Sequence, residues 1–196
     1  YNQERDDNLH SVFARYEHQL TDKPLTAYVG AGSTERFPDY WEMIAKESQM
    51  TVSAFNVAPE HTKQIDTGLL FADEKRQWSA SVFYNQIDDF ILVDYRSMMK
   101  MQGFVRNIDA SSYGAELTYS QRLGDSFKVD SSLAYTRGTN ETDNSALPQL
   151  APLEARIGAD YQQQDWSVGM LWRVVAAQDR YTLNTGNIVG KDLGPS

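Results

Sequence analysis

The strongest constraint on the fold of this chain is a two-residue hydrophobic repeat that recurs along most of its length. Between Phe127 and Tyr135, apolar or aromatic side chains occupy most of the odd positions, and polar ones such as Lys128 and Asp130 lie between them. Successive side chains of a β-strand point to opposite faces, so this period is typical of strands with one apolar face. We therefore predict an all-β fold.

The same alternation predicts eight consecutive strands. They span residues 9–20, 25–33, 63–71, 78–93, 113–119, 127–135, 153–161 and 166–174. The repeat is broken from Gln86 to Asp89, which predicts either a β-bulge or the end of membrane embedding at this point.

The links between the predicted strands alternate between short and long. The short ones lie at residues 21–24, 72–77, 123–126 and 162–165, and the long ones at 34–62, 94–106 and 138–152. In an antiparallel sheet all the long links then fall at one end. Outer-membrane barrels sort their loops in this way, with short periplasmic turns and longer extracellular loops. The predicted fold class is an antiparallel transmembrane β-barrel.

Aromatic side chains cluster where the short links meet the strands, on the apolar faces. The six residues are Phe71, Trp78, Tyr119, Phe127, Tyr161 and Trp166. Amphipathic rings collect at membrane interfaces, so we interpret them as one aromatic row of a barrel. The alternative interpretation is the core of a β-sandwich, where aromatic residues at strand ends are also common.

The opposite strand faces carry charged and small polar residues, which must face water or a polar filling. A basic side chain facing lipid at mid-bilayer would cost about 2–4 kcal/mol. A wide barrel accommodates such charges more easily than a closed eight-stranded one. We expect Glu154, Arg156 and Arg173, with Glu116, Asp130 and Asp160, to form a cross-strand ladder of opposite charges.

Composition excludes several classes of function. The formal net charge is −9, so no nucleic-acid partner is expected, because phosphate contacts need clustered Lys and Arg. There is no cysteine for a disulfide, a thiolate site or a nucleophile. No P-loop, nucleophile elbow or dinucleotide-binding glycine motif is present, so we do not expect an enzyme. The first ten residues lack the pattern of a signal peptide.

Several segments resemble a known family. WSASVFYNQIDDFI (residues 78–91) and VRNIDASSYGAELTYSQRL (residues 105–123) resemble consecutive barrel strands of TonB-dependent outer-membrane receptors. Four further strings resemble the copper receptor group of that superfamily. They are ERFPDYWE (Glu35–Glu42), ALPQLAPLEARIG (Ala146–Gly158), LWRVVAAQDR (Leu171–Arg180) and GNIVGKDLG (Gly186–Gly194).

The resemblance implies a 22-stranded barrel in the bacterial outer membrane, filled by a plug domain. Residues 1–196 would then be about eight consecutive strands of one barrel domain, with the plug outside this chain. The implied function is active transport of copper or a copper complex, with copper as substrate and no resident cofactor. The implied partners are outer-membrane lipid, the protein's own plug, and the TonB complex, reached through an N-terminal segment that this sequence lacks.

The candidate metal ligands lie in two of the long loops. Met98, Met99 and Met101 are three thioethers within four residues, and soft sulfur ligands suit Cu(I). His61, which we place in the 34–62 loop, could bind metal as a neutral imidazole. The alternative is that the methionines only line a loop or the barrel rim, and that the histidine is an ordinary surface residue.

Three other classes remain open at this stage. The chain could be a self-contained small β-barrel that binds a ligand, or part of a TonB-dependent receptor for a siderophore or another metal. It could also be a soluble β-sandwich from a sugar-active enzyme, in which case the apolar faces would be buried between two sheets.

Overall fold

A computed structural model describes residues 4–20, 23–43, 54–94 and 104–182 of the chain. Its regular elements are nine strands and one short helix. In chain order they are β1 (Ser11–Gln19), β2 (Leu25–Arg36), α1 (Tyr40–Met43), β3 (Glu60–Ala72), β4 (Arg76–Asp94), β5 (Phe104–Leu123), β6 (Phe127–Asn140), β7 (Ser145–Ala146), β8 (Glu154–Gln162) and β9 (Ser167–Val175). No helix in these ranges has the length and apolar character needed to cross a membrane.

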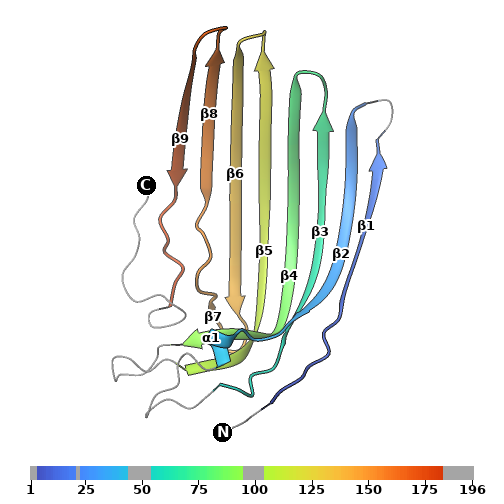
Figure 1. The fold of residues 1–196 in the computed structure, drawn as a ribbon, viewed down its shortest axis with the longest axis vertical. Helices are drawn as coiled ribbons and strands as arrows, with labels where there is room; N and C mark the ends of the chain where they lie inside the picture. The colour runs from blue at the N-terminus through green and yellow to red at the C-terminus, as the bar shows by residue number, and fades with distance from the viewer. Residues whose placement is uncertain (1–3, 21–22, 44–53, 95–103, 183–196) are drawn as a thin grey trace.

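The strands form one antiparallel sheet in the order β1-β2-β3-β4-β5-β6-β8-β9, with the two-residue β7 attached to β6. Figure 1 shows the long strands side by side, with the tight turns β3–β4, β5–β6 and β8–β9 at the top and α1 and β7 at the bottom. We call these the turn end and the loop end. Among the residues that the structure describes, the sheet is open, because β1 pairs only with β2 and β9 only with β8. The predicted sorting of short and long links is confirmed.

One face of the sheet is a continuous apolar surface, called here the apolar face. Cross-strand partners share a face, and one row runs Ala27, Leu69, Ala80, Leu117, Leu133 and on into β8. In the described part of the chain no second layer covers this surface. Val12 is 70% exposed, Met170 69% and Trp172 62%. Such exposure is incompatible with a β-sandwich core and fits a surface built to contact hydrocarbon.

The predicted aromatic row at the turn end is confirmed. The Phe71 and Trp78 rings stack with centroids 5.6 Å apart, and the Tyr161 and Trp166 rings lie 5.4 Å apart. Trp78 pairs with Tyr119, and Phe127 pairs with Tyr161. All six rings therefore belong to the apolar face.

A second aromatic row, which we did not predict, lies on the same face towards the loop end. Tyr84 pairs with Tyr113, and the Tyr113 and Tyr135 rings meet edge to face with centroids 6.5 Å apart. An apolar band bounded by two rows of amphipathic rings is the arrangement of a transmembrane barrel wall.

The opposite, polar face contains glycines that make room for larger neighbours. Phe83 pairs directly with Gly114, and a Cβ on Gly114 would lie 2.4 Å from the Phe83 ring and 2.4 Å from the Tyr135 carbonyl oxygen. Tyr28 similarly covers Gly68, where a Cβ would lie 2.8 Å from the ring. Aromatic rings thus shield glycine backbone that would otherwise weaken the strands.

Hydrophobic side chains form a buried cluster at the loop end, on the polar-face side. The cluster consists of Leu92, Ile108, Ala110 and Leu147, with Ile87, Phe90 and Leu150 packed against it. It depends on the β-bulge predicted near Gln86–Asp89: the register passes from Ile87↔Ala110 to Phe90↔Ile108, and Asp89 has a φ of 59°. Two residues of β4 therefore oppose one of β5, which turns Phe90 inward in place of Asp89.

The turn between β3 and β4 is held by one carboxylate. Asp73 accepts hydrogen bonds from the backbone N–H groups of Lys75 and Arg76, and its second oxygen accepts from the Arg76 guanidinium. The Arg76 side chain is the main cause of a lowered pKa of the Asp73 carboxyl, followed by the Lys75 backbone bond. A charged anchor of this kind keeps the turn short.

The predicted extents of several strands need correction. The strands reach further towards the loop end than the alternation indicated: β2 ends at Arg36, β3 begins at Glu60, and β5 spans Phe104–Leu123 instead of 113–119. The residues added to β2 and β3 are polar on both faces, so they escape a pattern that depends on one apolar face. In β5 the added Ile108 and Ala110 place apolar side chains on the polar-face side, out of phase with the alternation from Tyr113 to Tyr119. The short strand β7 was not predicted.

We predict that Gly114→Ala lowers the free energy of unfolding of the intact protein by about 1–3 kcal/mol, because the added methyl has no space against Phe83 and the Tyr135 carbonyl. Urea-induced unfolding in detergent micelles, followed by tryptophan fluorescence, measures the change. Gly158→Ala is the matched control on the same face, since its Cβ would meet nothing closer than 3.8 Å. Equal effects of the two substitutions would contradict this account.

Candidate functional site at the loop end

An asparagine ties the bulge to the connection that precedes β3. The Asn107 side-chain oxygen accepts from the Ala58 N–H at 2.7 Å, and its amide nitrogen donates to the Ala58 carbonyl at 3.0 Å and the Asp89 carbonyl at 2.7 Å. Arg5 holds the same connection by donating to the carbonyls of Phe55 and Val57. Two side chains therefore fix the path of residues 54–58.

Glu60 is a buried carboxylate, 8% exposed, at the start of β3. One of its oxygens accepts from the Ile91 N–H at 2.8 Å, and the other from Arg36 Nε at 2.7 Å. The Arg36 guanidinium also donates twice to Glu42, at 2.9 Å each. Glu42 and Asp39 cap α1 reciprocally, each accepting from the other's backbone N–H. The network joins β2, α1, β3 and β4.

The tight loop after β6 is anchored in the same way. Arg106 pairs with Asp143, and Asp143 also accepts from the Asn140 amide at 2.9 Å. The Asn140 side-chain oxygen accepts in turn from the Asp143 N–H. Asn140 is 1% exposed, so these bonds satisfy a fully buried side chain. Hydrogen bonds and ion pairs therefore hold the connections at the loop end in place.

The predicted ladder of opposite charges forms only in part. Glu154 pairs with Arg156 and with Arg173, whose Nη2 lies 2.6 Å from a Glu154 oxygen, and Lys128 pairs with Asp130 at 2.9 Å. Glu116 and Asp160 form no ion pair within the described residues. The pairs that do form place charge on the polar face, which requires a wet or polar surrounding.

The structure corrects the position given to His61. It lies in β3 and not in a loop, and its Nε2 is 2.7 Å from the Ser33 hydroxyl, within hydrogen-bonding distance. Met98, Met99 and Met101 lie outside the described residues. Within the described ranges no three His, Asp or Glu side chains converge as a metal site would require. Metal binding by these four residues stays a prediction.

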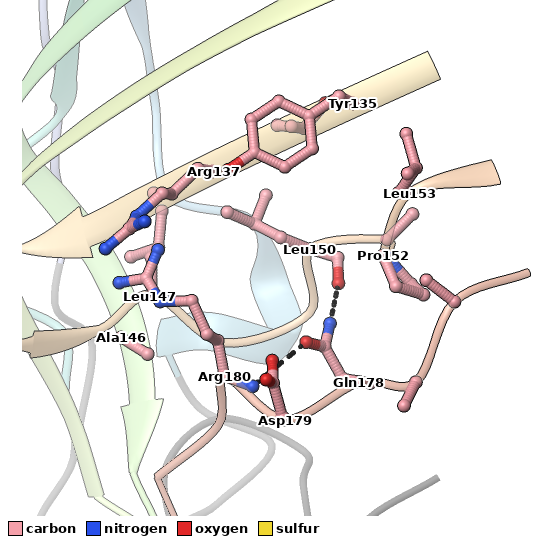
Figure 2. Close-up of a pocket in the computed structure, with 15 residues that line it drawn as sticks. Tyr135, Arg137, Ala146, Leu147, Leu150, Pro152, Leu153, Gln178, Asp179 and Arg180 are labelled. Carbon is pink, nitrogen blue, oxygen red and sulfur yellow. Dashed lines mark hydrogen bonds between the residues drawn. The ribbon is translucent and has the colours of Figure 1, made fainter. Parts of the chain in front are cut away.

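A cavity of about 380 Å³ opens at the loop end between β6 and the segments around β8 and β9 (Figure 2). Tyr135, Arg137 and Leu153 line it together with Arg180. None of these residues was singled out by sequence reasoning. Neither were Asn107 and Glu60, because their roles depend on backbone groups far away in the chain. The only sequence signal was their place near predicted strand ends.

These features together define a class of protein. A single antiparallel sheet with an uncovered apolar band, two aromatic rows and loops sorted by end is the wall of a transmembrane β-barrel. The TonB dependent receptor-like, beta-barrel family model matches residues 1–194, and the chain belongs to this family.

Solved structures agree with this assignment. The copper transporter OprC superposes with a TM-score of 0.89 and 45% sequence identity, over 98% of this chain. The FrpB iron transporter from Neisseria meningitidis (F3-3 variant) gives a TM-score of 0.66 and 14% identity over 85% of this chain and 27% of that one. FpvAI in complex with pyocin S2 gives 0.62 and 13%, over 84% and 23%. The last two show a shared fold alone.

The chain spans 30% of the length of the OprC chain, so it corresponds to a portion of that barrel. A search of the curated proteins returned no match.

We predict that Glu60→Ala destabilises the protein by about 1–3 kcal/mol, because the buried Ile91 N–H loses its acceptor and Arg36 loses one carboxylate. Chemical unfolding of the intact protein in micelles measures the loss, and hydrogen exchange should accelerate at the Ile91 amide. Glu17→Ala is the control, since it removes an ion pair with Arg15 between two more exposed side chains. A larger loss for Glu17→Ala would rule out the role given to Glu60.

Proposed function

We propose that this chain is part of the barrel of a bacterial outer-membrane, TonB-dependent receptor that actively transports copper or a copper complex. The observation that carries the proposal is the match to the copper transporter OprC, at 45% identity over 98% of the chain. Membership of the TonB-dependent receptor-like barrel family supports transport and an outer-membrane location. The receptor's own plug domain and the TonB complex are proposed partners.

The two faces of the sheet suit this function. The apolar face would contact outer-membrane lipid between the two aromatic rows. The polar face, with Glu154, Arg156 and Arg173, would contact water or the plug. The longer connections all emerge at the loop end, where extracellular substrate would arrive. The proposed role of this chain is passive: it supplies the wall and holds the loops in place.

A receptor for a siderophore or another metal is the alternative within the same family. FrpB, an iron transporter, shares the fold at 14% identity, which is far below the similarity to the copper transporter. A self-contained small barrel would need β1 and β9 to pair with each other. In the structure each pairs with one neighbour only.

We predict that deleting the gene for the full-length receptor lowers accumulation of radioactive copper by cells, and that a cell lacking functional TonB shows the same defect. Iron accumulation, measured in parallel, is the control and should not change. Loss of iron uptake with normal copper uptake would support the alternative receptor. Recovery of the receptor in the cytoplasmic fraction would contradict the proposed location.

The three candidate methionine ligands allow a more specific test of the substrate. Replacing Met98, Met99 and Met101 together by Leu keeps size and apolarity but removes three thioethers, so Cu(I) affinity of the full-length receptor should fall roughly tenfold, as a loss of about 1.4 kcal/mol implies. Competition with a chromogenic Cu(I) chelator measures it, and His61→Ala tests the fourth candidate. Met170→Leu, on the apolar face, is the matched control. Unchanged affinity in the triple variant would remove these residues as ligands.

A further inference from the structure

Three basic residues stand next to one another in a single row across the turn end of the sheet. Arg122 of β5 pairs directly with Lys128 of β6. On its other side, the Arg122 N–H donates to the Lys75 carbonyl at 2.8 Å, so the turn before β4 continues the same row. Strand alternation places the Arg122 and Lys128 side chains on the polar face, opposite the aromatic row. We call Lys75, Arg122 and Lys128 the basic row.

The basic row lines a pocket of about 690 Å³ at the turn end. Glu74, Asp125 and Asp160 line the same pocket, so its walls carry both signs of charge. Asp160 is the cross-strand partner of Lys128. Its carboxylate lies over β9 instead, where a Cβ on Gly169 would be 2.6 Å from Asp160 Oδ1. The basic side chains are all exposed and accessible from the pocket.

The acidic residues of the pocket do not neutralise the basic row. In the part of the chain that the structure describes, none of these three carboxylates forms an ion pair with it, and the Lys75 and Arg122 side chains have no ion pair at all. Lys128 pairs with Asp130, at 2.9 Å. Like charges on directly opposite strand residues repel each other. An anionic ligand that lies across Lys75 and Arg122 would relieve this repulsion.

The basic row differs from the rest of the polar face. The other arginines on that face of the described strands all have carboxylate partners. Arg15 pairs with Glu17, Arg36 with Glu42 and Glu60, Arg106 with Asp143, and Arg156 and Arg173 with Glu154. In a chain with a net charge of −9, two neighbouring cations without a carboxylate are an exception, which favours an anionic partner from outside the chain.

We propose that the basic row binds an acidic peptide segment of the receptor's own plug domain, through carboxylates that pair with Lys75 and Arg122. The polar face would line the interior of the proposed barrel, so a domain inside the barrel can reach the row. The contact would lie at the periplasmic mouth, where the short turns of a barrel are found. This inference rests on the plug of the proposed function but not on copper as the substrate.

The attachment would be weak and reversible. Ion pairs between exposed side chains stabilise a contact only slightly, and salt screens them. The plug would therefore be held at the periplasmic mouth by contacts that can break without unfolding the barrel. Sensitivity to ionic strength is the property that separates this attachment from one made by apolar packing.

The first experiment is carbodiimide crosslinking of the full-length receptor, purified in detergent. The reagent joins a lysine amine to a carboxylate in contact with it as an amide, and itself takes up the water that is lost. Mass spectrometry should find Lys75 or Lys128 linked to Asp or Glu residues of the plug. Lys23, in the β1–β2 turn at the same end, is the control and should give no such link. Links to Glu74, Asp125 and Asp160 alone, or no links, would overturn the proposal.

The second experiment measures hydrogen exchange in the crosslinked plug segment. Combining Lys75→Gln with Arg122→Gln should accelerate its exchange about threefold to tenfold. Sodium chloride at high concentration should bring the wild-type rate close to that of the double variant. Arg137→Gln with Arg180→Gln is the matched control, because these two arginines lie at the loop end and have no ion pair among the described residues. A heat-dependent gel shift verifies folding. Exchange that stays unchanged in the double variant would overturn the proposal.

These measurements are independent of the transport assays. Copper transport by a receptor without plug crosslinks would overturn this inference and leave the proposed function standing. Plug crosslinks in a receptor that transports no copper would support this inference and contradict the proposed substrate.

Discussion

The requirement that every backbone N–H and C=O be hydrogen-bonded in hydrocarbon governs this structure. In lipid only helices and continuous β-ladders meet it. Long antiparallel pairings from β2 through β8 meet this requirement. The backbone of each inner strand is hydrogen-bonded to a neighbour on both sides along the apolar band. Among the described strands, unpaired edges lie at β1 and β9. The ladder is interrupted only beyond the apolar band, towards the loop end, where polar contacts replace it.

The two ends of the sheet are stabilised in different ways because their surroundings differ. At the turn end, stacked rings and the Asp73–Arg76 pair are enough to close a short reversal. At the loop end, long connections must be held over an opening. Buried polar groups do this: Glu60 accepts from the distant Ile91 N–H, and Asn140 bonds to Asp143 within the loop that follows β6. Apolar side chains pack into a buried cluster next to these polar groups, because the bulge at Asp89 turns Phe90 towards the cluster. The cluster excludes water, which strengthens the neighbouring hydrogen bonds.

This division of the molecule clarifies its proposed work. In the proposed transporter, most of the wall would not bind the substrate, and specific contacts with it would be confined to the loop end. The polar face, which would face the proposed plug, carries ion pairs and glycines covered by aromatic rings.

Much of the fold could be predicted because alternation is a local signal. The eight long strands, the bulge and the aromatic row at the turn end all follow from which residues are apolar at every second position. Where both faces turn polar, as from Thr34 to Arg36, the same signal vanishes, and the extensions of β2 and β3 were missed for that reason. His61 was placed in a loop on the same grounds, although it pairs within β3. The family resemblance came from strings of residues, and periodicity alone could not have supplied it.

The sequence by itself determined that one side of these strands is apolar and the other polar, because side-chain order along a strand dictates its two faces. It also determined which links are short, since a turn of a few residues has few conformations. Only the tertiary structure decided which strands extend, how Asn107 and Glu60 brace the loops, and that Arg137 and Arg180 share a cavity. Those relations join residues that are tens of positions apart, and their proximity depends on the register of the whole sheet.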